Sequence, residues 1–226
     1  MKRQLLFSIL LSGVTSLYGY DFYGNYLFFK QSMHDMRKIG AIMPTSRSAA
    51  NELVRPLSFK VGARNILEVG AGTGAITEVI IAQLTPEDRF DIIEIDPALC
   101  QILHKKFGHL AHVHINSMSI EQWNPGYTYD VIISTIPLTN LAIEDIETIF
   151  NHFQYLAAPG AVFSYLEYMS APLKKLFINS QKAAVLQEKL QYMHDFRGQF
   201  RSNSVKVFVN VPPTYAHHIV LPGKLA

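Results

Sequence analysis

The chain has 226 residues, 49% of them hydrophobic, which is enough apolar material for one domain with a full core. The formal net charge is only +2, so the chain lacks the strong basic field expected of a nucleic-acid-binding protein. Its single cysteine, Cys100, excludes an internal disulfide. No cysteine or acidic residue lies at ligand spacing beside the paired histidines at 112, 114, 217 and 218, so we expect no metal site.

Residues 1–19 begin with Lys2 and Arg3 and continue as an apolar run without charge from Leu5 to Leu17. This pattern is typical of a signal peptide, and the run is too short to span a membrane comfortably. Three interpretations stay open: a cleaved signal, a membrane-associated helix, or a start assigned upstream of the true domain.

Residues 20–39 have the spacing of an amphipathic helix, in which aromatic and methionine side chains share one face. Lys30, Arg37 and Lys38 flank that face. The combination suits an anionic membrane surface, although a helix packed on the following domain would show the same periodicity. The apolar run just before it favours the membrane interpretation.

Pro44 ends this helix, and Thr45 or Ser46 can cap a second helix that continues to about Val54. We therefore divide the chain into an apolar segment at 1–19, N-terminal helices at 20–56 and a main domain at 57–226.

The main domain is organised around residues 65–97. A short apolar strand at 66–69 leads into three glycines at alternate positions, Gly70, Gly72 and Gly74. A helical pattern follows directly. Glycine has no Cβ, so a ligand can lie on the backbone of such a turn. The pattern predicts half of a nucleotide-binding βαβ unit.

Acidic residues indicate which nucleotide this unit binds. The next strand, from Phe90, ends in Glu94 and Asp96, where a carboxylate can accept hydrogen bonds from ribose hydroxyls. Glu68 lies just before the glycines, where it would repel a phosphate but would suit an ammonium group. S-adenosylmethionine carries an ammonium, a sulfonium and a ribose but no phosphate. We therefore expect an S-adenosylmethionine site.

The rest of the chain alternates between predicted helices and strands, which implies an α/β fold with right-handed crossovers and helices on both faces of the sheet. The predicted helices cover 97–107, 140–157 and 173–193. The predicted strands cover 112–115, 129–134, 161–165 and 205–211. The last strand is preceded by a turn at Asn203 and Ser204, ends at Pro212, and would form a hairpin at one edge of the sheet.

Four motifs carry a family resemblance. Leu-Glu-Val-Gly-Ala-Gly-Thr-Gly at 67–74 is similar to motif I of class I S-adenosylmethionine-dependent methyltransferases. Ile-Gly-Ala-Ile-Met-Pro-Thr-Ser-Arg at 39–47, Ile-Ser-Thr-Ile-Pro-Leu at 133–138 and Val-Asn-Val-Pro-Pro-Thr at 209–214 resemble segments of bacterial phospholipid N-methyltransferases. Together these motifs cover roughly residues 22 to 215.

The resemblance implies a Rossmann-like class I methyltransferase sheet that uses S-adenosylmethionine to methylate the amine of a phospholipid such as phosphatidylethanolamine. It implies an anionic membrane surface and an amino-phospholipid as partners, with the protein cytoplasmic and peripheral to the inner face of the membrane. If residues 1–19 act as a signal peptide, the protein is exported instead.

The resemblance also implies roles for individual residues. The cofactor contacts would come from Glu68, Gly70, Ala71, Gly72, Gly74, Glu94, Ile95, Asp96, Ser117, Met118 and Ser134. Either Glu94 or Asp96 would hold the ribose, because the register of the strand is open at this point. Ser117 stands where the family usually has an aspartate beside the adenine.

On the substrate side, Arg47 would bind the lipid phosphate, or else form an ordinary surface ion pair, and Pro137 would line the acceptor site. Tyr165, Glu167 and Tyr168 are the catalytic candidates, as a base or as a cage for the cationic amine. Water or the phosphate of the substrate could replace them as the base. The two tyrosines suit an ordinary core position equally well.

Two other functions remain open. The glycine and acid motifs also resemble ribosomal RNA adenine dimethyltransferases, but residues 135–138 lack the asparagine and aromatic residue which that family uses on a flipped base. A non-catalytic cofactor-binding or membrane-scaffolding protein is the other alternative, because Ser117 and Thr135 depart from the methyltransferase pattern.

Overall fold

The computed structural model describes residues 45–172, 178–210 and 212–223, which belong to one compact unit, Met43–Ala226. The predicted segment at 1–19 and the predicted helix at 20–39 lie outside the described residues. Across those ranges, each helix is too short or too polar to cross a membrane.

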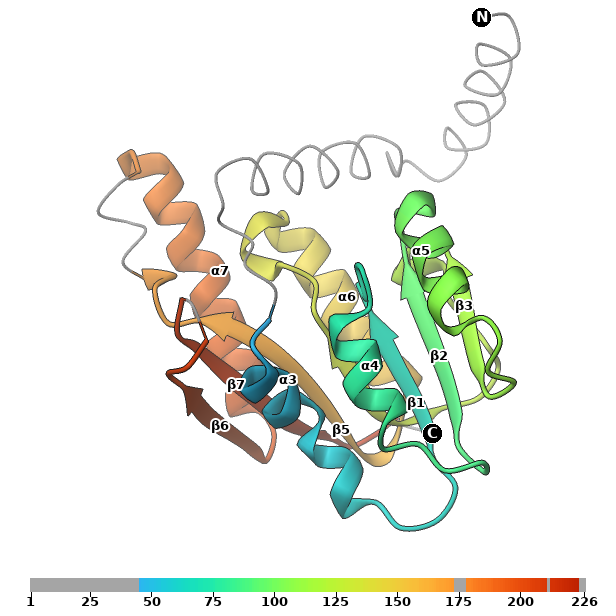
Figure 1. Cartoon of the computed structure of the whole chain (residues 1–226). Coiled ribbons are helices and arrows are strands. Elements are labelled where there is room, and N and C mark those ends of the chain that lie inside the picture. The colour runs from blue at the N-terminus through green and yellow to red at the C-terminus, as the bar shows by residue number, and fades with distance from the viewer. Residues whose placement is uncertain (1–44, 173–177, 211, 224–226) are drawn as a thin grey trace, which may run out of the picture. The chain divides into compact units, whose positions relative to one another are not determined.

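A seven-stranded sheet forms the centre of the unit (Figure 1). Its strands are β1 (Asn65–Val69), β2 (Arg89–Glu94), β3 (Val113–Ser117), β4 (Tyr129–Ser134), β5 (Ala157–Tyr168), β6 (Ser202–Val207) and β7 (Thr214–Leu221). Their order is β3-β2-β1-β4-β5-β7-β6. The first five strands are parallel, and β7 runs antiparallel between β5 and β6. The predicted α/β fold is confirmed.

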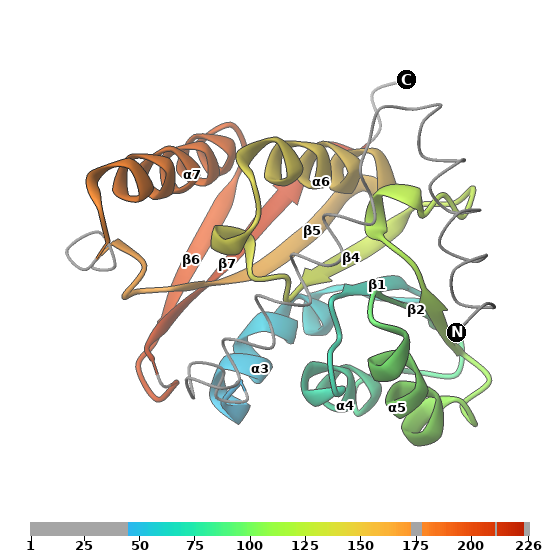
Figure 2. The same cartoon turned by 90° about the horizontal axis from the view of Figure 1, so that it is seen from above.

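Helices cover both faces of this sheet (Figure 2). One face carries α3 (Arg47–Val54), α4 (Ala75–Ile81) and α5 (Pro97–Phe107), and the other carries α6 (Ile143–Leu156) and α7 (Ser180–Gly198). Three short 3-10 helices join these elements: η1 (Arg55–Phe59), η2 (Ile120–Gln122) and η3 (Leu138–Asn140). Because strand side chains alternate, Leu67 packs toward α6 and α7 while Ile66 packs toward α3 and α4.

Helix caps explain where two of these helices begin. Ser46 caps α3, because its hydroxyl accepts a hydrogen bond from the Ala49 N–H at 3.2 Å. Asn179 caps α7 in the same way, accepting from the Lys182 N–H at 2.9 Å. The predicted helix at 173–193 is thus shifted: α7 starts later, behind its asparagine cap, and ends later.

The C-terminal hairpin differs most from the prediction. Asn203 and Ser204 were expected to form a turn, but both lie inside β6, where they pair with His218 and His217 of β7. The turn comes after Val207, and β7 follows it as a strand absent from the prediction. The Ser204 hydroxyl bonds Nδ1 of His217 at 2.7 Å, so strand pairing satisfies polar residues that suggested a turn.

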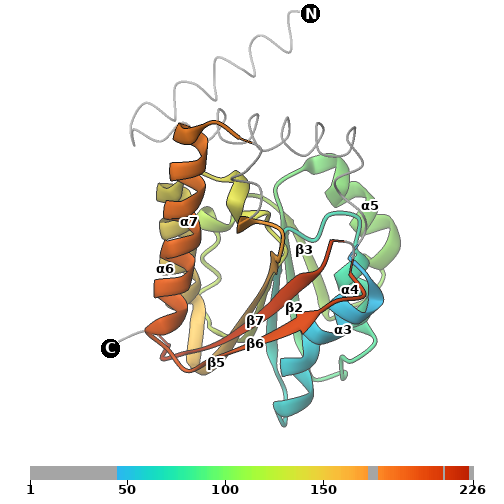
Figure 3. The same cartoon turned by 90° about the vertical axis from the view of Figure 1, so that its left-hand side faces the viewer.

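Strand β5 is also longer than expected. It begins at Ala157 and contains Pro159 and Gly160, which were predicted to precede the strand as a turn. The register against β4 shifts between Tyr129 and Val131, which absorbs the extra residues. The long strand continues to Tyr168, past Tyr165, which pairs with the last residue of β4. Figure 3 shows β6 and β7 beside it.

Candidate active site

The loop from β1 to α4 contains three glycines with positive φ angles: 80° at Gly70, 60° at Gly72 and 91° at Gly74. They are needed for different reasons. A Cβ on Gly74 would lie 2.6 Å from Phe107 Cε2 of α5, and one on Gly70 would lie 3.2 Å from Ile136 Cγ1. A Cβ on Gly72 would meet no atom within 4 Å. The space above Gly72 is therefore open to a ligand.

Glu94 ends β2 beside this open position. Its Oε2 accepts a hydrogen bond from the Gly72 N–H at 2.8 Å, and its Oε1 accepts one from the Asp96 N–H at 3.0 Å. Burial raises the pKa of this carboxyl group. Asp96 instead caps α5 by accepting from the Ala98 N–H at 2.8 Å. Of the two predicted ribose acids, Glu94 is the one that lies at the glycine loop.

Glu68 lies beneath the same loop and is fully buried. The Thr77 hydroxyl donates to its Oε2 at 2.7 Å, while its Oε1 has no hydrogen-bond partner among the described residues. Burial raises the pKa of Glu68 to about 8, and the nearby charge of Glu94 adds to the effect. A cationic ligand group near this buried carboxyl would favour its ionised form, as predicted for the ammonium of S-adenosylmethionine.

The residues after β4 contact the start of the β1–α4 glycine loop. Ser134 is buried at the end of β4, and Pro137 follows in the turn that leads to η3. The Thr135 N–H donates to the Val69 carbonyl at 3.0 Å, and its hydroxyl donates to the Gly70 carbonyl at 2.5 Å. Thr135 departs from the family pattern, and no local sequence signal predicts this link between residues so far apart in the chain.

The remaining predicted cofactor residues surround this loop. Ala71 is buried within it, and Ile95 follows Glu94. Ser117 ends β3 with an exposed side chain, and the Met118 N–H donates to the Glu94 carbonyl at 3.2 Å. The structure thus brings the predicted cofactor residues to one edge of the sheet, at the carboxyl ends of its parallel strands, which is the usual place for a ligand in an open α/β sheet.

The structure does not bring the three catalytic candidates onto one face. Tyr165 and Glu167 point toward α7, and Tyr168 points to the opposite face because strand residues alternate. Tyr165 is only 1% exposed, its hydroxyl accepts from Arg197 Nη1, and burial raises its pKa. Tyr165 is therefore a core residue, and its proposed catalytic role is corrected to a packing role.

Glu167 forms an ion pair with Arg197 at 3.1 Å, and Nε2 of His217 lies 3.4 Å from its Oε2. Burial alone would raise the pKa of Glu167, but His217 and Arg197 together hold it below its usual value. Glu167 is thus a stable carboxylate. Arg197 was absent from the sequence interpretation, since no local motif marks it.

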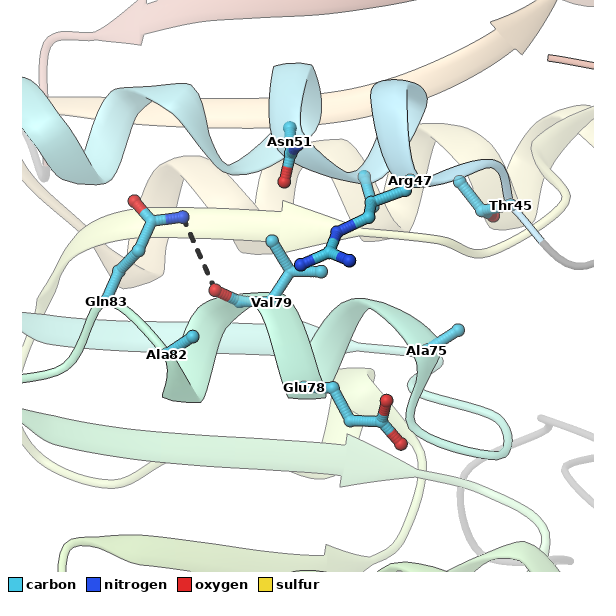
Figure 4. Close-up of a pocket in the computed structure, with 9 residues that line it drawn as sticks. Thr45, Arg47, Asn51, Ala75, Glu78, Val79, Ala82 and Gln83 are labelled. Atoms are coloured by element: carbon cyan, nitrogen blue, oxygen red, sulfur yellow. Dashed lines mark hydrogen bonds between the residues drawn. The ribbon is translucent and has the colours of Figure 1, made fainter. Parts of the chain in front are cut away.

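Arg47 lies on the first turn of α3 with an exposed side chain. It lines a groove of about 540 Å³ between α3 and α4, together with Asn51, Glu78 and Gln83 (Figure 4). Ala75, the first residue of α4, also lines the groove, which therefore starts next to the glycine loop. Among the described residues, no three His, Cys, Asp or Glu side chains gather closely enough to hold a metal ion.

Known proteins resemble this chain over the strands that carry this site. A family model for a methyltransferase domain matches residues 67–163, from β1 into β5. The chain is 29% identical over 132 residues to malonyl-[acyl-carrier protein] O-methyltransferase 1 from Ilyobacter polytropus, which covers 58% of this chain and 47% of that relative. It is 25% identical over 150 residues to an ornithine lipid N-methyltransferase from Singulisphaera acidiphila, covering 64% of this chain and 78% of that relative.

The chain thus spans about half of the first relative and most of the second. Among solved structures, the N-methyltransferase NodS from Bradyrhizobium japonicum WM9 superimposes with a TM-score of 0.57 at 19% identity, covering 78% of this chain and 96% of NodS. NodS in complex with S-adenosyl-L-homocysteine superimposes with a TM-score of 0.55, covering 78% of this chain and 87% of NodS.

The strand order, the glycine loop and the acid at the end of β2 define a Rossmann-like methyltransferase fold. With the family match over residues 67–163, they show that the chain contains an S-adenosylmethionine-dependent methyltransferase domain of the class I fold. S-adenosylmethionine is its cofactor, and the open Gly72 and the unpartnered oxygen of Glu68 fit that molecule.

Proposed function

We propose that this methyltransferase acts on the amine of a phospholipid head group and converts phosphatidylethanolamine to its methylated forms. The observation that carries the proposal is the similarity to an ornithine lipid N-methyltransferase over 78% of that relative. The lipid substrate implies a protein that works peripherally on the inner face of a membrane.

The cofactor would lie across the glycine loop. Its ribose hydroxyls would take over the carboxylate of Glu94, which bonds the loop backbone in their absence. Its ammonium would lie on the side of the loop nearest Glu68, whose buried Oε1 has no partner among the described residues. Ser117 and Met118, at the end of β3, would border the adenine. When bound, the cofactor supplies an electrophilic methyl group, and these residues hold it in place.

Methyl transfer to an amine is an in-line displacement. The nitrogen lone pair forms the new bond to the methyl carbon while the carbon–sulfur bond breaks and its electrons return to sulfur. The acceptor is an ammonium ion with a pKa near that of lysine, about 10, so it must first lose a proton. That proton goes to water or to the phosphate of the lipid.

The residues of this chain position the acceptor rather than take its proton. Glu167 is a poor base because Arg197 holds it ionised, and this ion pair leaves no free charge for the head group. Tyr168, half-buried at the end of β5, offers an aromatic face to the cationic head group. Pro137 would line the acceptor side of the cofactor loop.

Arg47 supports the choice of a phospholipid. Its side chain is exposed at the start of the groove beside the glycine loop, where a guanidinium can bind a phosphate with two hydrogen bonds. Glu78 in the same groove is paired with Lys106 at 3.0 Å, which leaves Arg47 available for an anion.

A panel of acceptors tests the proposal. The protein would be incubated with radiolabelled S-adenosylmethionine and detergent-dispersed phosphatidylethanolamine, an ornithine lipid, a malonyl-acyl carrier protein or RNA. The proposal predicts label in an amino-lipid only. Label in the acyl carrier protein would indicate an O-methyltransferase instead. Label in RNA would indicate an RNA adenine N-methyltransferase. Cofactor binding with no labelled product would favour the non-catalytic interpretation.

A further inference from the structure

The turn between β6 and β7 exposes two large apolar side chains. Phe208 is 67% exposed and Val209 is 68% exposed. They follow directly after Val207, the last residue of β6. Leaving two adjacent apolar residues in water costs free energy, and the methyltransferase chemistry described above does not use them.

The described part of this turn is anchored at Asn210. Asn210, which follows the apolar pair, is 4% exposed and accepts a hydrogen bond from the Ser46 N–H at 2.9 Å. Its side-chain amide donates to the Pro212 carbonyl at 2.8 Å. One side chain therefore joins the turn to the start of α3. The exposed pair therefore directly precedes a residue that is bonded to the start of α3.

The turn lies at the edge of the sheet that carries the cofactor site. Strands β5 and β6 are both antiparallel to β7, so β6 ends at the same edge as β5 and β4. Ser134, at the end of β4, pairs with Tyr165, and β5 continues to Tyr168. These three further residues carry the hairpin about 10 Å beyond the end of β4.

Cations accompany the apolar pair. Lys206 is exposed on β6, two residues before Phe208, and the exposed Arg47 follows Ser46, the residue bonded to Asn210. Apolar side chains next to basic ones are the combination that binds an anionic bilayer, where each cation adds about 1 kcal/mol of attraction.

We propose that Phe208 and Val209 form a membrane-insertion tip that enters the boundary between head groups and acyl chains of an anionic bilayer. The tip would hold the cofactor edge of the sheet against the head groups that carry the acceptor amine. This inference rests on the proposed lipid substrate, and it specifies how the enzyme meets that substrate.

The opposite edge of the sheet provides a matched control. Phe59 is 68% exposed at the end of η1, and the neighbouring Lys60 donates to the Gly160 carbonyl near the amino end of β5. Phe59 therefore has the residue type and exposure of Phe208 but lies at the edge away from the cofactor loop. A flat bilayer cannot contact both edges, so only Phe208 should insert.

Tryptophan quenching by brominated lipid tests insertion directly. Phe208→Trp and Phe59→Trp would be made in the full chain, with the wild-type signal of Trp123 subtracted from both. Vesicles of phosphatidylethanolamine and phosphatidylglycerol would carry bromine on their acyl chains. We expect quenching and a blue shift for Phe208→Trp alone. Equal quenching of both variants, or of neither, would overturn the proposal.

A blue shift of Phe208→Trp that grows with protein concentration in the absence of vesicles would also overturn the proposal, because the tip would then bind a second copy of the protein.

Activity measurements distinguish a failure of this inference from a failure of the proposed function. Phe208→Ser should lower methylation of lipid in vesicles roughly tenfold and leave methylation in detergent micelles unchanged. If wild-type protein methylates no lipid in either form, the proposed function fails, and quenching still decides on insertion.

Discussion

The Gly72 N–H donates to Oε2 of Glu94 at 2.8 Å, so the acid that ends β2 is already fixed at the one glycine of the β1–α4 loop whose surroundings are open. This contact joins the β1–α4 loop to the end of β2, whereas the sequence predicts only that the two lie near each other. It also separates Glu94 from Asp96, whose side chain is engaged in capping α5.

Replacing Glu94 with alanine should therefore raise the dissociation constant of S-adenosylmethionine at least tenfold, because two ribose hydrogen bonds to a charged group are lost, each contributing roughly 1.5–3 kcal/mol. Calorimetric titration measures the constant. Asp96→Ala is the matched control: it should cost about 1 kcal/mol of stability through the lost cap and leave the constant unchanged. If Asp96→Ala weakens binding and Glu94→Ala does not, the assignment is wrong.

The glycines should respond to alanine in different ways. Gly74→Ala puts a methyl group 2.6 Å from Phe107 Cε2 at a left-handed φ, so we expect a loss of roughly 2–4 kcal/mol in the free energy of unfolding. Gly72→Ala meets no atom, so its stability should fall by only about 1–2 kcal/mol.

The methyl group of Gly72→Ala would, however, occupy the space above the loop and weaken cofactor binding. Chemical denaturation and cofactor titration of both variants separate the two effects. Similar losses of stability with unchanged cofactor affinity for Gly72→Ala would show that the open space is not the cofactor surface.

Glu68 should give the protein without cofactor a distinct pH dependence. The folded protein holds a proton on Glu68 between its ordinary pKa of 4.5 and about 8, whereas the unfolded chain has released it. The free energy of unfolding contributed by this group should thus fall as pH rises through that window, by at most about 1.4 kcal/mol per pH unit.

Denaturant unfolding of the wild type and of Glu68→Gln across the window isolates this contribution, because all other groups titrate alike in both proteins. The wild type should lose stability relative to the glutamine variant as pH rises. A difference between the two proteins that does not vary with pH would mean that Glu68 titrates normally.

The ion pair between Arg197 and Glu167 should stabilise the folded protein. Arg197→Met leaves the carboxylate of Glu167 largely buried without its 3.1 Å partner, and it frees the hydroxyl of Tyr165, so we expect a loss of roughly 3 kcal/mol. Arg201→Met, at an exposed position between α7 and β6, should cost under about 0.5 kcal/mol. Thermal unfolding distinguishes them, and equal shifts in the midpoint would contradict the importance of the pair.

The cofactor half of the fold could be predicted closely from the sequence. Helix α5 and strand β4 have the predicted bounds, 97–107 and 129–134, because local signals mark them: a proline after an acidic cap for α5, and an uninterrupted apolar run for β4. The three glycines were likewise recognisable from their spacing, whereas the choice between Glu94 and Asp96 needed the contacts that the structure shows.

The C-terminal half depended on contacts that no local pattern reveals. Strand β7 contains His217 and His218, which interrupt its apolar run, yet both are buried because Ser204 and Ser164 bond their Nδ1 atoms at 2.7 and 2.8 Å. The core position of Tyr165 follows from the partner that α7 supplies. The burial of such residues depends on tertiary packing, so it could not be predicted from the sequence.

The central claim is that the cofactor edge delivers a methyl group to a lipid amine. The most direct measurement is the mass of phosphatidylethanolamine recovered after incubation with S-adenosylmethionine that carries a deuterated methyl group, using wild-type protein and Glu94→Ala side by side. The account predicts lipid that is heavier by one or more labelled methyl groups with the wild type, and strongly reduced product with Glu94→Ala. Unlabelled lipid from a wild-type protein that binds the cofactor would contradict it.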